Sequence, residues 1–114
     1  MTDATGSRLQ AVVEAAQGRG ERVVVVMAAA TRTASLDAFA RALDFPAWFG
    51  RNLDALADCL CERAPSDGGA LHLVWADAGR LDEADPDGAR GIRAVLRDIA
   101  KEHPTLHVTV LAGQ

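Results

Sequence analysis

An unbroken apolar run over residues 23–27, four valines and a methionine, constrains the fold of this chain more than any other feature. Strands buried on both faces of a parallel sheet have such runs, whereas half-exposed antiparallel strands alternate apolar and polar residues. Residues 70–76 and 106–112 are predicted to form two further strands, and helical patterns separate all three. Parallel strands need long crossovers of this kind. We therefore predict an α/β fold, with a three-stranded parallel sheet packed with helices and an extra N-terminal helix.

The segment before the first strand is predicted to form that extra helix. Residues 7–17 carry apolar side chains at helical spacing, Ser7 is a candidate N-cap, and two glycines follow. We assign residues 1–20 to this leader helix, which either packs on the domain or precedes it, and residues 21–114 to the α/β domain. A length of 114 residues suits one such domain, since domains usually hold about 100–150 residues.

Start and stop signals predict the helices of the crossovers. After the first strand, either Thr33 or Ser35 can cap a helix that Pro46 ends. Residues 77–85 are short and polar, and they predict one or two helical turns. Asp85 followed by proline is typical of an N-cap and a first helical position, so the last helix is expected to run to about residue 102.

Charge and hydropathy exclude several classes of protein. The net charge of −4 and pI near 5.2 argue against a nucleic-acid partner, which would select a basic surface, and favour a cationic one. No apolar run approaches the ~18 residues of a membrane span, and no secretory signal begins the chain. We therefore expect a cytoplasmic protein that is not bound to membranes.

Neither a catalytic centre nor a metal site is predicted. Cys59 and Cys61 are two residues apart on one predicted helix, so their side chains diverge and are expected to be free thiols. The histidines, His72, His103 and His107, are not at metal-ligand spacing with another ligand. Phosphate-binding glycine loops are also missing from the sequence. We therefore expect a protein that is not an enzyme and has no cofactor.

Residues 45–60, FPAWFGRNLDALADCL, combine a loop with the start of another helix. Asn52 is the candidate N-cap of that helix. At ~100° per residue the leucines and the acids of the helix fall on opposite sides, Leu53, Leu56 and Leu60 inward and Asp54, Asp58 and Glu62 outward. The loop adds Trp48 and Phe49, of which Phe49 is assigned mainly to the core. An aromatic ring beside a row of acids is a plausible binding surface for a cationic partner.

This stretch resembles the signature of the barstar family, intracellular protein inhibitors of secreted microbial ribonucleases. The shared pattern is a proline, an aromatic pair, Gly50, Asn52, then Leu-Asp-Ala-Leu and Asp-Cys-Leu. The order of strands and helices around it also agrees, so the resemblance covers about residues 22–112. It implies the same α/β fold and a partner that is a basic, extracellular-type ribonuclease, either barnase-like or related. We expect the inhibitor to be a monomer.

The resemblance also implies which residues bind the ribonuclease. The residue matching Asp58 places its carboxylate where an RNA phosphate would lie, and the one matching Asp54 makes a second charged contact. The predicted partner-binding set is Trp48, Gly50, Asn52, Leu53, Asp54, Ala57, Asp58 and Asp98. Three positions depart from the best-known pattern: Ala57 replaces a tryptophan, Arg63 replaces an aromatic residue, and Arg51 replaces an acid. These departures leave the row of acids in place but favour a partner with a different rim.

Other interpretations stay open at this point. The acidic row can be an ordinary solvated helix face, and Asp98 an ordinary surface acid. The same row can serve an immunity or regulatory module that binds another basic protein. Two further alternatives are a thiol-redox role for Cys59 and a hydrolase that uses Asp54 and Asp58 as acid and base.

Overall fold

A computed structural model describes residues 4–113 of the chain. Its elements follow in the order α1 (Ala4–Gly18), β1 (Arg22–Met27), α2 (Arg32–Leu43), α3 (Leu53–Arg63), β2 (Leu71–Ala76), α4 (Gly79–Ala84), α5 (Pro86–Glu102) and β3 (Leu106–Val110). The strands form one parallel sheet in the order β1-β2-β3. The predicted fold class is therefore confirmed, and β1 and β3 are its two edge strands.

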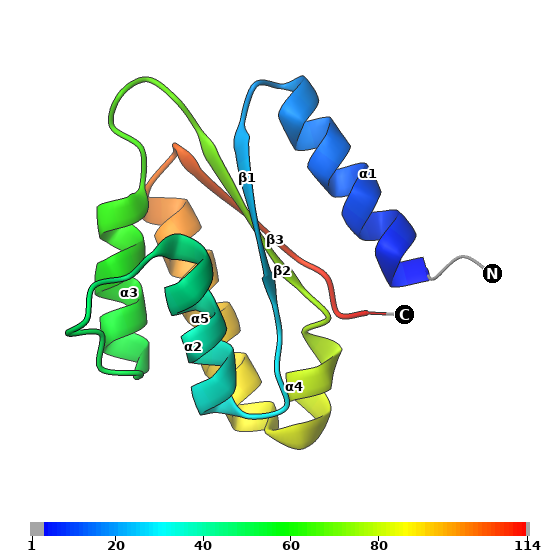
Figure 1. The fold of residues 1–114 in the computed structure, drawn as a ribbon, viewed down its shortest axis with the longest axis vertical. Helices are drawn as coiled ribbons and strands as arrows, with labels where there is room; N and C mark the ends of the chain where they lie inside the picture. Colours follow the sequence, from blue (N-terminus) through cyan, green and yellow to red (C-terminus); the bar gives the residue numbers. More distant parts are fainter. Residues whose placement is uncertain (1–3, 114) are drawn as a thin grey trace.

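Helices cover both faces of the sheet (Figure 1). On one face α2 contacts β1, α5 contacts β3, and α3 packs against α5. This side holds the main core, in which Trp75, Phe39 and Leu73 are fully buried. On the other face α1 contacts β1 and β2 and buries Ala16 completely. The leader helix thus packs on the sheet, although residues 1–3 of the segment 1–20 lie outside the described part and the domain boundary at residue 20 stays a prediction.

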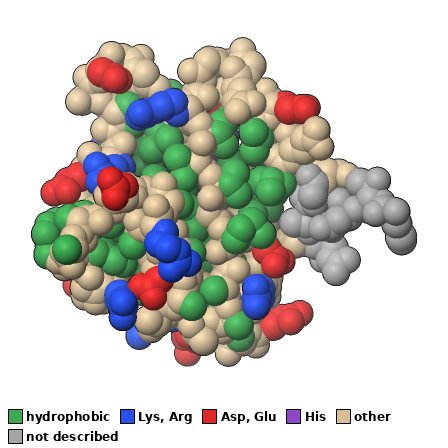
Figure 2. All heavy atoms as spheres, viewed as in Figure 1, with side chains coloured by type: hydrophobic (Ala, Val, Ile, Leu, Met, Phe, Trp, Pro, Cys, Tyr) green, Lys and Arg blue, Asp and Glu red, His purple; other side chains and the backbone are tan. Residues whose placement is uncertain are grey.

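The central strand explains why the sheet needs both layers. All six residues of β2 are buried, and its pleat sends Leu71, Leu73 and Trp75 to one face and His72 and Val74 to the other. Figure 2 shows the edge at which β1 lies, with apolar side chains gathered on both sides of its backbone and charged side chains around them. Because β2 has apolar residues on both faces, it is stable only between two covering layers of helices.

Several predicted helix boundaries were wrong. Helix α1 already begins at Ala4, so Ser7 lies within it and does not cap it. The N-cap of α2 is Thr31, whose side chain accepts a hydrogen bond from the Ala34 amide, in place of Thr33 or Ser35. The Ser35 hydroxyl instead bonds the backbone of Ala29 at 3.0 and 3.2 Å. Helix α2 ends at a left-handed residue, Asp44 with φ 54°, before Pro46 is reached.

The predicted beginning of the last helix is confirmed. The Asp85 side chain accepts a hydrogen bond from the Gly88 amide at 3.0 Å, and Pro86 occupies the first turn of α5. The polar segment before it contains the single short helix α4. Among the described residues, no helix is both long enough and apolar enough to span a membrane.

Candidate protein-binding site

Helix α3 has the predicted cap and the predicted two-sided pattern. The Asn52 side chain accepts a hydrogen bond from the Ala55 amide at 2.8 Å. Leu56 and Leu60 are buried and Leu53 is half-buried, which fixes the rotation of the helix. The acids on the opposite side, Asp54, Asp58 and Glu62, are all exposed. The fold therefore turns one continuous row of carboxylates toward solvent.

The loop before α3 packs two of its three aromatic residues inward and leaves the third exposed. Phe45 is buried and its ring packs on that of Phe49, with centroids 5.1 Å apart. Phe49 is packed against the core, as predicted, and its amide donates to the carbonyl of Pro46 at 3.0 Å. Trp48, in contrast, is 60% exposed. The packing of Phe49 on Phe45 thus anchors a short turn that presents Trp48 to solvent.

Arg51, the first unusual residue of the loop, is held by an ion pair. Its Nε lies 2.9 Å from Oδ1 of Asp37 on α2, and its backbone adopts φ 54°. The pair joins the loop to α2 and neutralises much of the positive charge at this position. The sequence did not indicate this partner, because the two residues lie on different elements.

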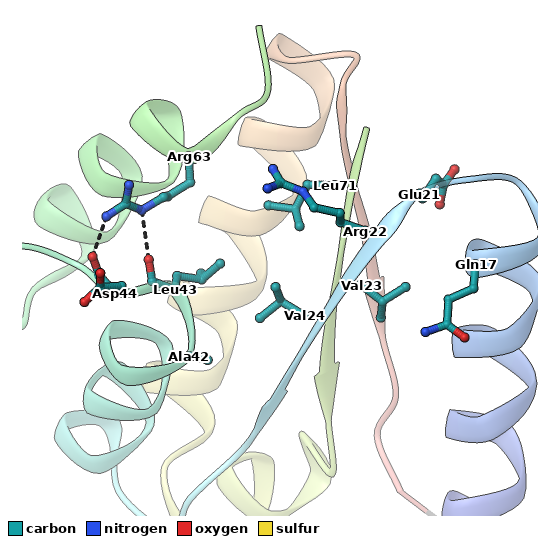
Figure 3. Close-up of a pocket in the computed structure, with 10 residues that line it drawn as sticks. All are labelled: Gln17, Glu21, Arg22, Val23, Val24, Ala42, Leu43, Asp44, Arg63 and Leu71. Atoms are coloured by element: carbon teal, nitrogen blue, oxygen red, sulfur yellow. Dashed lines mark hydrogen bonds between the residues drawn. The ribbon is translucent and has the colours of Figure 1, made fainter. Parts of the chain in front are cut away.

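Arg63, the second unusual residue, joins the ends of two helices. Its guanidinium donates from Nε to the carbonyl of Leu43 at 2.8 Å and from Nη2 to that of Asp44 (Figure 3). These carbonyls belong to the C-terminal end of α2, where backbone acceptors have no partner within the helix. The side chain thus fixes the last turn of α3 against the end of α2, where the loop begins.

Helices α3 and α5 pack closely near Leu53, one turn before Ala57, which is the third unusual residue. A Cβ atom on Gly91 of α5 would lie 2.6 Å from Cδ1 of Leu53, so glycine there lets the two helices approach. Ala57, one turn further along α3, is half-buried and packed against the core. Asp98 follows Gly91 at an interval of seven residues, on the same side of α5, and its side chain is 64% exposed. The predicted site residues thus lie on α3, on the loop before it and, for Asp98, on the side of α5 that carries Gly91.

The two cysteines are free thiols, as predicted, and Cys59 is only 1% exposed. Burial raises the pKa of the Cys59 thiol, and the carboxylates of Glu62 and Asp58 raise it further. A buried thiol that resists ionisation is a poor nucleophile, so these properties disfavour a redox role.

Cys61 is half-buried, and it lies close to two residues at the end of α5. Its sulfur and the side-chain ligand atoms of Glu102 and His103 all lie within 4.8 Å of one another. Burial raises the pKa of the Cys61 thiol, and Glu102, Asp58 and Glu62 add to that effect. Sequence spacing missed this cluster, because it forms only when α3 and α5 pack.

A second polar cluster missed by the sequence lies on the opposite face of the sheet, beside α1. His72 is buried, with Nδ1 2.9 Å from a Glu21 carboxylate oxygen and Nε2 2.7 Å from the Thr109 hydroxyl. Glu21 also accepts two hydrogen bonds from Arg19. The bonds from Arg19 and then His72 lower the pKa of the Glu21 carboxyl to about 2. This network stabilises the fold away from the candidate site.

A cavity of about 450 Å³ lies at the amino end of β1, between the ends of α1, α2 and α3 (Figure 3). None of the predicted partner-binding residues lines it. Its arginine from α3, Arg63, is already engaged with the carbonyls of α2. The candidate site is therefore an exposed surface and not this pocket.

Comparison with known proteins decides the family. The family model described as "Barstar (barnase inhibitor)" matches residues 19–111, which is most of the chain. This chain belongs to the barstar family. A search of curated proteins found no match. The match includes the whole sheet, the loop before α3 and all the predicted site residues, and membership is therefore a property of the described domain and not of the short motif alone.

Proposed function

We propose that this barstar-family protein inhibits a secreted-type microbial ribonuclease by covering its basic active site with α3 and the preceding loop. One observation carries the proposal: the row of Asp54, Asp58 and Glu62 on α3 is exposed, and so is the ring of Trp48 in the loop that leads into this helix. An acidic row and a projecting aromatic ring fit a basic cleft that binds RNA phosphates. The chain would act in the cytoplasm of the producing cell, as a monomer, without a cofactor and without catalytic chemistry of its own.

In this mechanism each residue has a defined part. The Asp58 carboxylate, near the middle of the row, occupies a phosphate position among the basic groups of the enzyme, and Asp54 adds a contact nearer the N-terminus of α3. Trp48 and the turn over Gly50, Asn52 and Leu53 supply shape. Ala57 and Asp98 form the margin toward α5. Inhibition is competitive with RNA because the same basic groups cannot bind both ligands.

The departures from the family pattern define what kind of ribonuclease fits. Ala57 is too small to reach across an interface, so the centre of the contact is flatter than a tryptophan would make it. Arg51 and Arg63 make bonds within the chain, to Asp37 and to the end of α2, and their charges stay at the margin. The cognate enzyme should therefore present a basic centre with a rim different from that of barnase.

The test is calorimetric titration of the native chain into a panel of basic microbial ribonucleases, with RNA cleavage measured in parallel. We expect stoichiometric binding and loss of cleavage for the cognate enzyme. Asp58→Asn should weaken binding by several kcal/mol, because it leaves a cluster of buried positive charges without its partner. Glu83→Gln on α4 is the matched control, since it removes the same charge from an exposed position outside α3 and its loop and should leave affinity nearly unchanged.

Salt dependence separates a charged interface from an apolar one. The association rate should fall steeply as ionic strength rises, because screening shortens the range of the acidic field to about 8–10 Å near physiological salt. An association rate indifferent to salt, or equal effects of Asp58→Asn and Glu83→Gln, would contradict the proposed mode. Binding to a basic protein without nuclease activity would instead favour the regulatory or immunity module.

A further inference from the structure

Cys61, Glu102 and His103 combine the three side-chain donors that Zn²⁺ uses in proteins, a sulfur, an imidazole nitrogen and a carboxylate oxygen. All their ligand atoms lie within 4.8 Å of one another. Ligand atoms of a tetrahedral zinc site stand about 3.3–3.8 Å apart, as bond lengths of ~2.0–2.3 Å require. The three donors therefore need to converge by at most about 1–1.5 Å. Rotation of the exposed Glu102 side chain can supply much of this movement.

The fold holds the backbone of this cluster in place. The carbonyl of Cys61 accepts the amide of Ala64 at 3.3 Å, at the end of α3. The amide of His103 donates to Ile99 at 2.9 Å, and its carbonyl accepts the amide of Leu106 at 2.9 Å, where the chain turns into β3. Donors placed at the ends of packed helices are better fixed than donors on a free loop.

The electrostatic surroundings favour a cation. Helices α3 and α5 run parallel, since Leu53 meets Gly91 near their first turns and Cys61 meets Glu102 near their last. Their C-terminal ends therefore lie side by side (Figure 1), and each carries partial negative charge. The carboxylates of Asp58 and Glu62 add to the negative potential at Cys61. A divalent cation is attracted by this negative potential.

We propose that Cys61, Glu102 and His103 bind one thiophilic divalent cation of the Zn²⁺ class, with water at the fourth position. The Cys61 thiol gives its proton to solvent as the metal–sulfur bond forms, and His103 binds as the neutral imidazole. Magnesium does not fit this site, because it prefers six oxygen donors. The metal joins α3 to α5 at the ends opposite to the Leu53–Gly91 contact. The site does not depend on ribonuclease binding.

Cobalt is the direct probe, because a thiolate bound to Co²⁺ gives a charge-transfer band in the near ultraviolet. Titration of the native chain, reduced with a phosphine, should give one Co²⁺ per chain, and Zn²⁺ should displace it and remove the band. Cys61→Ala should abolish the band. His103→Gln should weaken binding at least tenfold. The matched controls Cys59→Ala and His107→Gln change the same residue types elsewhere and should bind like the native chain.

Thermal unfolding gives a readout that needs no absorbing metal. Zn²⁺ should raise the melting temperature of the native chain and of Cys59→Ala, since a metal bound only to the folded state stabilises it. It should not raise that of Cys61→Ala, each variant being compared with itself without metal. Absence of metal binding, a band that persists in Cys61→Ala, or a band lost in Cys59→Ala would each overturn the proposal.

Discussion

Removing the Arg63 guanidinium should destabilise the protein, although the side chain is exposed. Arg63 donates two hydrogen bonds to the carbonyls of Leu43 and Asp44 at the end of α2. A net contribution of about 0.5–1.5 kcal/mol for each bond gives roughly 1–3 kcal/mol for the pair. The larger contribution of buried charged donors does not apply to Arg63, because water competes for hydrogen bonds at an exposed site.

Arg41→Ala is the matched control for Arg63→Ala. Arg41 lies in the last turn of α2 and Arg63 in that of α3, so each substitution loses a similar favourable interaction with a helix C-terminus, about 0.3–1 kcal/mol. Arg41 makes no side-chain hydrogen bond within residues 4–113. The difference between the variants therefore isolates the carbonyl bonds.

Thermal and urea unfolding followed by circular dichroism measure this difference. Arg63→Ala should unfold about 1–3 kcal/mol more easily than Arg41→Ala, or roughly 4–12 °C lower at ~4 °C per kcal/mol for a chain of this size. Arg63→Lys should fall between them, because a lysine keeps the charge but cannot reproduce the planar fork. Equal stability of the two alanine variants would refute the reasoning.

Two further stability predictions concern other parts of the fold. The hydrogen bonds that Glu21 accepts, from Arg19 above all, lower its pKa from 4.5 to about 2, so their stabilisation is complete above pH 4.5 and is lost as pH falls toward 2. The difference in free energy of unfolding between the native chain and Glu21→Gln, measured with urea, should therefore shrink over that interval, and a constant difference would contradict the prediction. A Cβ on Gly79 would lie 2.3 Å from the Ala112 carbonyl oxygen, so Gly79→Ala should lower the free energy of unfolding by about 1–3 kcal/mol. Gly18 has open space around it, so Gly18→Ala should raise the free energy of unfolding by up to about 1 kcal/mol. Stability changes of the same sign for the two variants, measured by calorimetry, would refute this contrast.

The fold was predictable because its signals are local. The valine run of β1, the Asn52 cap and the Asp85–Pro86 start each depend on a few neighbouring residues. The predicted start of α2 was wrong because Thr31, Thr33 and Ser35 can all cap a helix by residue type. The choice among them depends on the position of the helix against β1.

The arrangement of the candidate site was also predictable only where its signals are local. Helical periodicity was enough to place Asp58 on the exposed side of α3, and the motif drew attention to Trp48. No periodicity relates Arg51 to Asp37, or Cys61 to Glu102, because these pairs form between different elements. Contacts of that kind depend on how helices pack, which a single sequence does not specify.

The same long-range contacts bear on the specificity of the proposed inhibitor. A positive charge on Arg51 or Arg63 is unfavourable opposite a basic enzyme, since like charges across an interface cost free energy. Asp37 offsets the charge of Arg51 through their ion pair. Arg63 keeps its charge, because the carbonyls that accept its bonds are neutral, but these bonds hold its guanidinium at the end of α2. Breaking the Arg51–Asp37 pair with Asp37→Asn should free a positive charge beside Trp48 and slow association with the cognate ribonuclease, although Asp37 itself need not touch the enzyme.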